Sequence, residues 1–297
     1  MNILITGANG QLGNEMRVLS TSHPDHRYFF TDVEELDITC REAVLDFVRT
    51  NAIDLIVNCA AYTNVDRAEE DEPTALRINA DAVANLAASG VRIIHVSTDY
   101  VFSGDEHRPC REDDPVAPRT AYGRTKLAGE QQLLSLCPEA VILRTAWLYS
   151  TYGNNFVKTM IRLGKEKPEL GVVFDQIGTP TYAADLAAAI FTVIEADQWH
   201  PGIYHFTNEG VCSWYDFTLA IHDLAGIRSC QVRPILSSEY RYKTPRPHYS
   251  VLDKSRFKQT FGVSIPYWLD GLKRCIQKLN TENLILNTDE RNSQFLI

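Results

Sequence analysis

Short apolar runs alternate with helical patterns along the first half of the chain. The runs are four or five residues long, rich in β-branched or aromatic residues and apolar almost throughout, as strands buried on both faces are. They are Ile3–Thr6, Tyr28–Thr31, Leu55–Asn58, Ile93–Ser97 and Val141–Thr145. Between them lie stretches with helical spacing, namely 41–50, 74–89 and 120–136. Repeated strand and helix predict an α/β fold with a parallel sheet and right-handed crossovers.

The regularity weakens after Trp147. Residues 150–155 are rich in turn formers, and the polar, proline-punctuated region 237–247 is typical of a loop. One more buried strand at Val172–Phe174 and a helix at Ala183–Glu195 lie in between. We therefore expect the chain to return to the sheet before it completes a smaller lobe.

Charge and composition exclude several classes of function. The net charge is −9 and no run of Lys or Arg offers a basic face, which argues against nucleic acid as a partner. No apolar run approaches the roughly 18 residues of a membrane helix, and Ile3–Ile5 lacks the basic lead and the length of a signal peptide. Seven scattered cysteines without C-x-x-C spacing are typical of reduced thiols. We expect a cytoplasmic protein that does not bind membranes.

Three glycines follow the first predicted strand and precede a helical pattern. They belong to the run Gly7-Ala8-Asn9-Gly10-Gln11-Leu12-Gly13. Glycines in this position let the backbone approach a pyrophosphate, and the helix N-terminus offers free N–H groups to it. A plain tight turn is the alternative. The context favours a Rossmann-type, doubly wound parallel sheet that binds NAD(P) through residues 1–150, with 171–200 returning to it. Residues 151–297 would then form mainly a substrate-binding lobe, with 281–297 as an extra tail.

Residues after the second and third predicted strands extend this cofactor site. Asp32 lies where a carboxylate accepts hydrogen bonds from the adenosine ribose and repels a 2′-phosphate, and no Arg follows it, which favours NADH over NADPH. A turn residue is the alternative for Asp32. We expect Asp37 and Ile38 to flank the adenine. After the third strand, Ala60, Ala61 and Tyr62 would pack along the cofactor.

A candidate proton donor follows in the next helical stretch. Tyr122 and Lys126 are four residues apart and share a helix face. A lysine ammonium one turn away would lower the pKa of the tyrosine and suit it to acid–base catalysis. Thr98 ends the fourth run at the carboxyl edge of the sheet, where its hydroxyl can hydrogen-bond a substrate carbonyl. Ser97 should point to the other face; both residues could instead merely cap the strand.

Together these motifs resemble the extended short-chain dehydrogenase/reductase family. The matching segments run from the N-terminus to about Arg274: Gly7–Gly13, Asn58–Asp66, Ser97–Phe102, Tyr122–Lys126, Arg144–Tyr149 and Asp175–Thr181. The resemblance implies that NAD(P)H reduces the 4-keto group of a nucleotide sugar. It gives Tyr122 the role of protonating the new oxyanion, Lys126 that of holding the nicotinamide ribose, and Thr98 that of orienting the ketone.

The same resemblance implies a substrate pocket and an assembly. Val65, Asp99, Tyr100 and Trp147 would line the sugar pocket, and Arg246 would approach the diphosphate. Asp99 could instead cap a helix, and Trp147 could pack in the core. Some family members form homodimers around Mg²⁺ held by glutamates. Glu15 is present, but Ala184 stands where another glutamate is expected, so we predict no metal bridge.

Two other functions remain open. One is a reductase or epimerase for another nucleotide-sugar ketone. The base of the nucleotide is also open, because thymine and uracil differ by only one methyl group. The other is a catalytically silent binding subunit, such as the similar regulatory subunit of methionine adenosyltransferase. Such a subunit would keep the glycine loop without needing Thr98, Tyr122 and Lys126.

Overall fold

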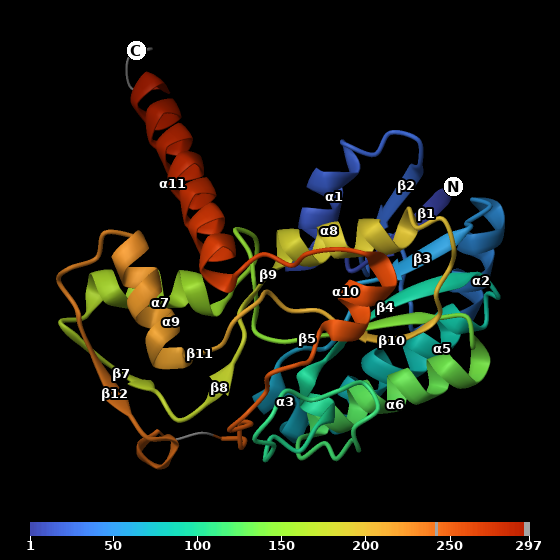
Figure 1. Ribbon diagram of the computed structural model, residues 1–297. Coiled ribbons are helices and arrows are strands. Elements are labelled where there is room, and N and C mark those ends of the chain that lie inside the picture. The colour runs from blue at the N-terminus through green and yellow to red at the C-terminus, as the bar shows by residue number, and fades with distance from the viewer. Residues whose placement is uncertain (241–242, 294–297) are drawn as a thin grey trace.

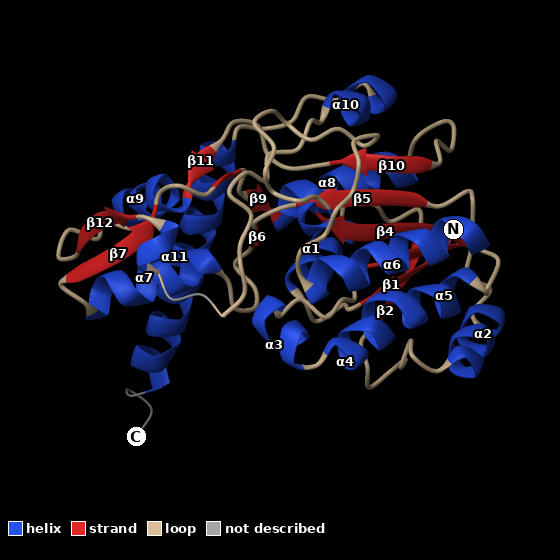
Figure 2. Ribbon diagram, turned by 90° about the horizontal axis from the view of Figure 1, so that it is seen from below, coloured by secondary structure: helices blue, strands red, loops and turns tan. Residues whose placement is uncertain are grey.

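A six-stranded parallel sheet forms the centre of the computed structural model, which describes the backbone of residues 1–240 and 243–293 and side chains up to Thr281. Figure 2 shows the strands in one layer, with β2 and β10 at opposite edges. Their order is β2 (Arg27–Thr31), β1 (Asn2–Thr6), β3 (Leu55–Asn58), β4 (Arg92–Thr98), β5 (Val141–Thr145) and β10 (Gly202–His205). The α/β prediction and its five strands are confirmed. From β1, the next strand, β2, is added on one side and β3 and the later strands on the other. The switch point therefore lies between β1 and β3, the place where such sheets bind ligands.

Both faces of this sheet are buried under helices. Side chains alternate along each strand, so β1 directs Ile3 and Ile5 into one apolar cluster and Leu4 into the other. Figure 1 shows the two helical layers, and each apolar cluster contains residues from one of them. The first layer consists of α1 (Gln11–Ser20) and α8 (Ala183–Ile194); the second consists of α2 (Arg41–Thr50), α5 (Ala82–Ala87) and α6 (Ala121–Leu136). The near-continuous apolar character of the strands follows from this double burial.

The helical stretch predicted for 74–89 is interrupted. It consists of α4 (Glu72–Leu76), a π-helical turn η1 (Arg77–Asp81) and α5, and it follows α3 (Val65–Glu70). Here α6 approaches η1 so closely that a Cβ on Gly129 would lie 2.0 Å from the carbonyl oxygen of Asn79. Only glycine permits this approach, which packs α6, the helix of Tyr122 and Lys126, against η1.

Segments of the second half of the chain other than α8 and β10 build a smaller lobe beside the sheet (Figure 1). Its apolar cluster includes Tyr149, Phe217 and Trp268. Its main elements are α7 (Phe156–Glu166), β7 (Glu169–Val173), α9 (Trp214–Leu224), β12 (Gln231–Ile235) and α11 (Trp268–Ser293). The remaining elements are short: η2 (Asp99–Val101), β6 (Leu148–Tyr149), β8 (Ile177–Gly178), β9 (Thr181–Tyr182), β11 (Cys212–Ser213), η3 (Ser237–Glu239) and α10 (Ser255–Phe261).

The return to the main sheet differs from the prediction in one respect. The strand expected at Val172–Phe174 is β7, which pairs in parallel with β12 in a separate two-stranded sheet. The strand that returns is β10, which pairs with β5. The partner of β7 lies about 60 residues further along the chain, and a pairing this distant leaves no mark on the local apolar pattern that the prediction used.

The remaining general predictions concern the tail, the membrane and the thiols. The predicted tail, 281–297, begins within α11, and its last four residues lie outside the described part of the structure. Within the residues described, none of the helices is both long and apolar enough to cross a membrane. The seven cysteines are free thiols.

Candidate active site

The glycine loop forms a tight cradle between β1 and α1. Gly7 has a φ of +64°, and a Cβ there would lie 2.7 Å from the backbone of Ala60. A Cβ on Gly13 would lie 2.5 Å from the carbonyl oxygen of Gly7. Gly10 is the N-cap of α1, and no side chain caps the helix there. The loop therefore exposes a helix N-terminus beside closely packed backbone, which fits a pyrophosphate.

A cleft of about 370 Å³ opens from this loop. Most of the predicted cofactor residues line it: Gly7, Gly10, Asp32, Asp37, Ile38, Ala60 and Ala61. The carboxylate of Asp32 accepts hydrogen bonds from the backbone N–H groups of Asn9 (3.0 Å) and Val33 (2.9 Å). Hydrogen bonds from Thr39 lower the pKa of Asp37. These predicted residues therefore lie together, as a dinucleotide site requires.

Other residues of the predicted cofactor site face elsewhere. The side chain of Gln11 accepts a hydrogen bond from Asn155 at 3.1 Å, and Leu12 is buried in the core. Tyr62 donates its backbone N–H to Asn79 and packs in the same small cluster as Tyr122. Gln11, Leu12 and Tyr62 are therefore not among the residues that line the cleft.

Arg77 also lines the cleft, although sequence reasoning found no arginine near Asp32. It belongs to η1, about 45 residues after Asp32, and its charge contributes to lowering the pKa of Asp37. Only the fold brings it there, because residues 28–40 around Asp32 hold no Lys or Arg.

Thr98 and Tyr122 meet at the carboxyl edge of β4. The hydroxyl of Thr98 donates to Asp99 Oδ1 at 3.0 Å and accepts from the backbone N–H of Tyr100 at 3.2 Å. Thr98 therefore caps η2, the role considered above for Asp99. The ring of Tyr122 packs edge-on against Tyr100 with 5.4 Å between centroids. The predicted pair lies together, and Ser97 has a buried hydroxyl without a described hydrogen-bond partner.

The pKa of Tyr122 differs from the prediction. Burial raises this pKa from 10 to about 12, although a hydrogen bond with Thr98 opposes the increase. Lys126 does not offset the effect of burial on this pKa, and its amine contacts β4 instead. The expectation that Lys126 lowers the pKa of Tyr122 is therefore wrong for this structure. At neutral pH the phenol is protonated, which is the form that can donate a proton.

Lys126 is almost completely buried beneath the site. Its Nζ donates to the carbonyl oxygen of Val96 at 2.8 Å and lies 3.2 Å from Nε2 of His95. Burial lowers the pKa of Lys126 to about 8. A lysine with this pKa can change its charge near neutral pH.

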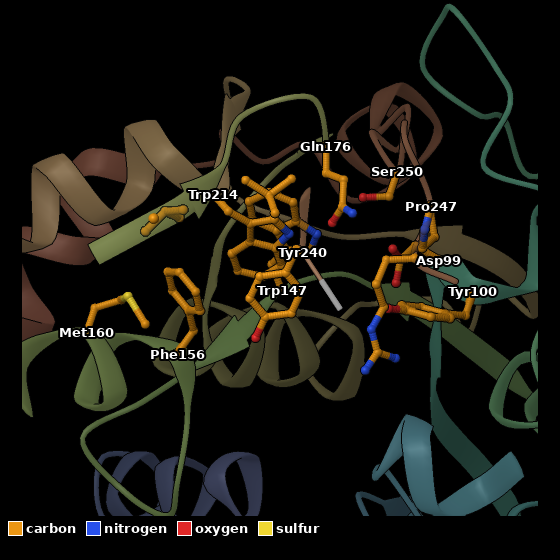
Figure 3. Close-up of a pocket in the computed structure, with 14 residues that line it drawn as sticks. Asp99, Tyr100, Trp147, Phe156, Met160, Gln176, Trp214, Tyr240, Pro247 and Ser250 are labelled. Carbon is orange, nitrogen blue, oxygen red and sulfur yellow. The ribbon is translucent and has the colours of Figure 1, made fainter. Parts of the chain in front are cut away.

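A second cavity of about 220 Å³ lies between the sheet domain and the smaller lobe. Figure 3 shows Trp147 and Trp214 stacked on one side of it, with 3.4 Å between ring centroids, and Asp99 and Tyr100 on the other. Trp147 has a φ of +49°, which is uncommon for a bulky residue, and its position at the cavity wall suggests that function requires it there. The predicted residues Asp99, Tyr100, Trp147 and Arg246 line this cavity, whereas Val65 does not.

Several further lining residues escaped sequence reasoning. They are Phe156, Met160, Gln176, Trp214, Tyr240 and Ser250. Gln176 stands within a segment already noted as matching the family, Asp175–Thr181, but its spacing alone gave it no role. The aromatic and apolar members come from the smaller lobe, where the pattern could equally indicate core packing.

Two charged residues give this cavity a polar side. Burial raises the pKa of Asp99 to about 7, and its Oδ2 is buried with no hydrogen-bond partner in the described structure. The Nη2 of Arg246 pairs with Asp66 at 2.9 Å, while its Nη1 is likewise buried without a partner among the described residues. An unpartnered guanidinium N–H in a cavity wall is suited to an anionic ligand.

Glu15 is engaged by this chain's own side chains. It is buried, accepts a hydrogen bond from Ser150 at 2.6 Å and lies 3.6 Å from Nζ of Lys278. Among the residues whose side chains are described, no group of three or more His, Cys, Asp or Glu residues could hold a metal ion. The absence of a metal bridge stays a prediction.

The chain is similar to known proteins over most of its length. The family model described as the RmlD substrate binding domain matches residues 1–281. The dTDP-4-dehydrorhamnose reductase of Aggregatibacter actinomycetemcomitans is 41% identical, with 91% of this chain and 97% of that protein covered. A probable dTDP-4,6-dihydroxy-2-methyloxan-3-one 4-ketoreductase of Streptomyces antibioticus is 42% identical over 92% and 94% of the two chains. The crystal structure of dTDP-4-dehydrorhamnose reductase from Bacillus anthracis in complex with NADP superposes with a TM-score of 0.89, at 40% identity over 93% and 99% of the chains.

Proposed function

This chain belongs to the RmlD substrate binding domain family, and we propose that it catalyses the reaction for which its relatives are named. That reaction is the reduction of dTDP-4-dehydrorhamnose (dTDP-6-deoxy-L-lyxo-4-hexulose) at its C4 ketone by NAD(P)H, which gives dTDP-L-rhamnose. The cytoplasm, where nucleotide sugars and reduced nicotinamides are available, is the expected location.

The position of Tyr122 is the observation that carries this proposal. Its ring packs against Tyr100, which lines the cavity between the lobes, and in one small cluster with Tyr62, which follows Ala61 of the glycine-loop cleft. A proton donor between two ligand cavities is what reduction of a ketone needs, because hydride and proton must reach the same carbonyl from different groups. A binding subunit would need the cleft but not this donor.

Each residue then has a specific task. The glycine cradle fits the pyrophosphate of a dinucleotide, and bound NAD(P)H supplies hydride to C4. On ketone binding, the hydroxyl of Thr98 would turn its one hydrogen from Asp99 to the ketone oxygen. Together with Tyr122 it would then oppose the negative charge on that oxygen, and Tyr122 donates the proton. Lys126 offers an N–H to the nicotinamide ribose. Arg246 holds the diphosphate, and Trp147 and Trp214 form an apolar wall for the sugar and base.

We expect NADH to be the better cofactor. The carboxylate of Asp32 lies in the cleft and would repel a 2′-phosphate, whereas Arg77 in the same cleft would attract one. Asp32 is held by the loop backbone, so we give it the larger weight. The value of kcat/KM should be higher with NADH than with NADPH. A higher kcat/KM with NADPH would contradict this expectation. If Arg77→Gln then abolished the preference for NADPH, that preference would be assigned to Arg77.

We expect neither activity nor assembly to need Mg²⁺. The carboxylate of Glu15 already accepts from Ser150 and faces Lys278, whose cation occupies the place next to it. Added EDTA should leave both turnover and the elution volume in size-exclusion chromatography unchanged. If EDTA splits a homodimer into monomers, a metal bridge exists and the proposal is wrong on this point.

The proposed reaction is tested by incubating the pure protein with NADH and enzymatically prepared dTDP-4-dehydrorhamnose. Product identity comes from mass and chromatography. Formation of dTDP-L-rhamnose with loss of NADH absorbance would support the proposal. The likeness to the Streptomyces antibioticus 4-ketoreductase makes another dTDP-linked ketone the second candidate, and turnover of such a ketone alone would favour it.

A further inference from the structure

The single hydrogen of the Thr98 hydroxyl is already in use. Thr98 donates it to Asp99 Oδ1 at 3.0 Å and accepts the backbone N–H of Tyr100 at 3.2 Å. A hydroxyl has one hydrogen and two lone pairs, so only one lone pair is left. The proposed reaction needs that same hydrogen at the ketone oxygen. The protonation state of Asp99 therefore decides whether Thr98 can act on a ketone.

An ionised Asp99 would retain this hydrogen. Asp99 is buried at the wall of the cavity between the lobes (Figure 3), and its Oδ2 has no hydrogen-bond partner among the described residues. If Thr98 turned away from a carboxylate, a buried negative charge would lose the hydrogen bond from that hydroxyl, which is costly. After burial, the charge of Asp99 is a further cause of the raised pKa of Tyr122. A negative Asp99 would likewise oppose negative charge on a ketone oxygen at this site.

A protonated Asp99 removes this conflict. Its carboxylic O–H can donate to the remaining lone pair of Thr98 across the same 3.0 Å, while the backbone N–H of Tyr100 keeps the other lone pair. The hydrogen of Thr98 is then free to point at a ligand oxygen. All hydrogen bonds of the Thr98 hydroxyl are made in this arrangement, and no negative charge lies beside the ketone.

We propose that Asp99 acts as a neutral carboxylic acid, a positioning residue that donates to Thr98 and so releases the hydrogen of Thr98 to the ketone oxygen. The inference rests on the proposed function for the identity of that ligand. Burial raises the pKa of Asp99 to about 7, although hydrogen bonding from Thr98 opposes the increase. The acid form is therefore present at and below neutral pH, and ionisation withdraws the hydrogen of Thr98 as the pH rises through 7.

Three ionisable groups are close enough to interact with the charge of Asp99, and they remain neutral near pH 7. They are Tyr100 on η2, Tyr122 on α6 and Cys110 in the loop between these elements. Burial raises the pKa of Tyr122 and that of Cys110 to about 12, and it raises the pKa of Tyr100 above its usual value. None of the three therefore titrates together with Asp99.

Two cations near the site are engaged elsewhere. Arg246 lines the same cavity as Asp99 and directs Nη2 at Asp66, 2.9 Å away. The amine of Lys126 donates to the carbonyl of Val96 at 2.8 Å. Burial lowers the pKa of Lys126 to about 8, so its titration adds a separate pH effect that a variant of Asp99 keeps.

Asp99→Asn tests the proposal because asparagine cannot ionise. Its amide N–H donates to Thr98 at every pH, as the carboxylic acid does only below its pKa. We compare kcat/KM for the nucleotide sugar at saturating NADH in the wild type and in this variant. The ratio of wild type to variant should fall about 10-fold from pH 6 to pH 8, as one group with a pKa of about 7 requires. The effect of Lys126 cancels in this ratio.

Asp253→Asn is the matched control. The carboxylate of Asp253 accepts the backbone N–H of Ser255 at 2.8 Å, and Asp253 lines neither cavity. The variant makes the same chemical change away from the site and should keep the wild-type decline of kcat/KM.

Titration of Asp99 itself needs neither NADH nor a sugar. NMR of protein labelled with ¹³C at the aspartate Cγ atoms should show a signal that titrates near pH 7 and is lost in Asp99→Asn. In Thr98→Val the signal should titrate at higher pH, because valine keeps the shape of threonine but removes the hydroxyl that stabilises the carboxylate. This shift identifies the signal even if Asp99→Asn does not fold.

An Asp99 that titrates near the ordinary value of about 3.9 would overturn the proposal, and so would equal declines of kcat/KM in the wild type and Asp99→Asn. A signal near pH 7 that moves in Thr98→Val, in protein that reduces no sugar ketone, would retain the coupling of Asp99 to Thr98 and reject the proposed reaction. Reduction of the sugar by protein whose Asp99 titrates near its ordinary value would do the reverse.

Discussion

Tyr122→Phe should lower kcat by about 100-fold or more and leave the Kd for NADH nearly unchanged. A positioned acid contributes at least this factor, and phenylalanine removes the proton while keeping the ring that packs against Tyr100. Because burial raises the pKa of Tyr122 to about 12, the wild-type phenol is fully protonated at neutral pH. We therefore expect no decline of kcat that reflects ionisation of Tyr122 between pH 6 and pH 9, roughly. Steady-state kinetics at saturating NADH and fluorescence titration of NADH measure the two quantities.

Tyr28→Phe is the matched control for this substitution. Tyr28 belongs to β2 and lines neither cavity, and its hydroxyl donates to the carbonyl of His23 at 2.8 Å. This variant loses the same atom and should keep full kcat. If Tyr122→Phe retains more than about a tenth of wild-type turnover, another group donates the proton.

Arg246→Met should raise the KM for the nucleotide sugar by about 10- to 100-fold with a smaller change in kcat. Hydrogen bonds to charged groups contribute about 1.5–3 kcal/mol, which corresponds to this range. The buried Nη1 of Arg246 has no partner among the described residues, and Nη2 is fixed by Asp66, so the guanidinium is oriented before ligand binds. Methionine keeps most of the side-chain volume. Initial rates at varied sugar concentration separate KM from kcat.

Lys243→Met provides the comparison for Arg246. Lys243 is three residues away, carries the same charge and pairs with Glu70 at 3.2 Å on the exposed surface. Its loss should leave the KM within about twofold, because exposed ion pairs contribute little. Equal KM values for Arg246→Met and the wild type would show that the diphosphate binds elsewhere.

Local sequence patterns were sufficient for the nucleotide-binding half. The strand Ile3–Thr6 and the glycines after it are consecutive in the chain, so one short segment carries both the strand signal and the turn signal. Tyr122 and Lys126 were found for the same reason, since a helix converts a spacing of four into a shared face. The observed sheet contains the strand, and Gly7 and Gly10 line the cleft, where the pattern put them. The roles of Tyr122 and Lys126 stay predictions.

Contacts between distant segments could not be predicted in this way. Arg246 meets Asp66 across 180 residues, and Trp147 stacks on Trp214 from another part of the smaller lobe. His95 was read only as part of the apolar run Ile93–Ser97, because nothing local indicates that its ring faces Lys126. The effect of burial on the pKa of Tyr122 has the same origin. Desolvation depends on the whole fold, whereas the spacing showed only a nearby lysine.

The most direct test of the central claim uses NADH deuterated at the transferable C4 position. Pure protein, this cofactor and dTDP-4-dehydrorhamnose should give dTDP-L-rhamnose with one deuterium at C4 of the sugar and one equivalent of oxidised cofactor. Mass spectrometry and proton NMR locate the label. Folded protein that transfers no deuterium from either NADH or NADPH, or that returns it to tightly held cofactor without net oxidation, would contradict the proposed reduction.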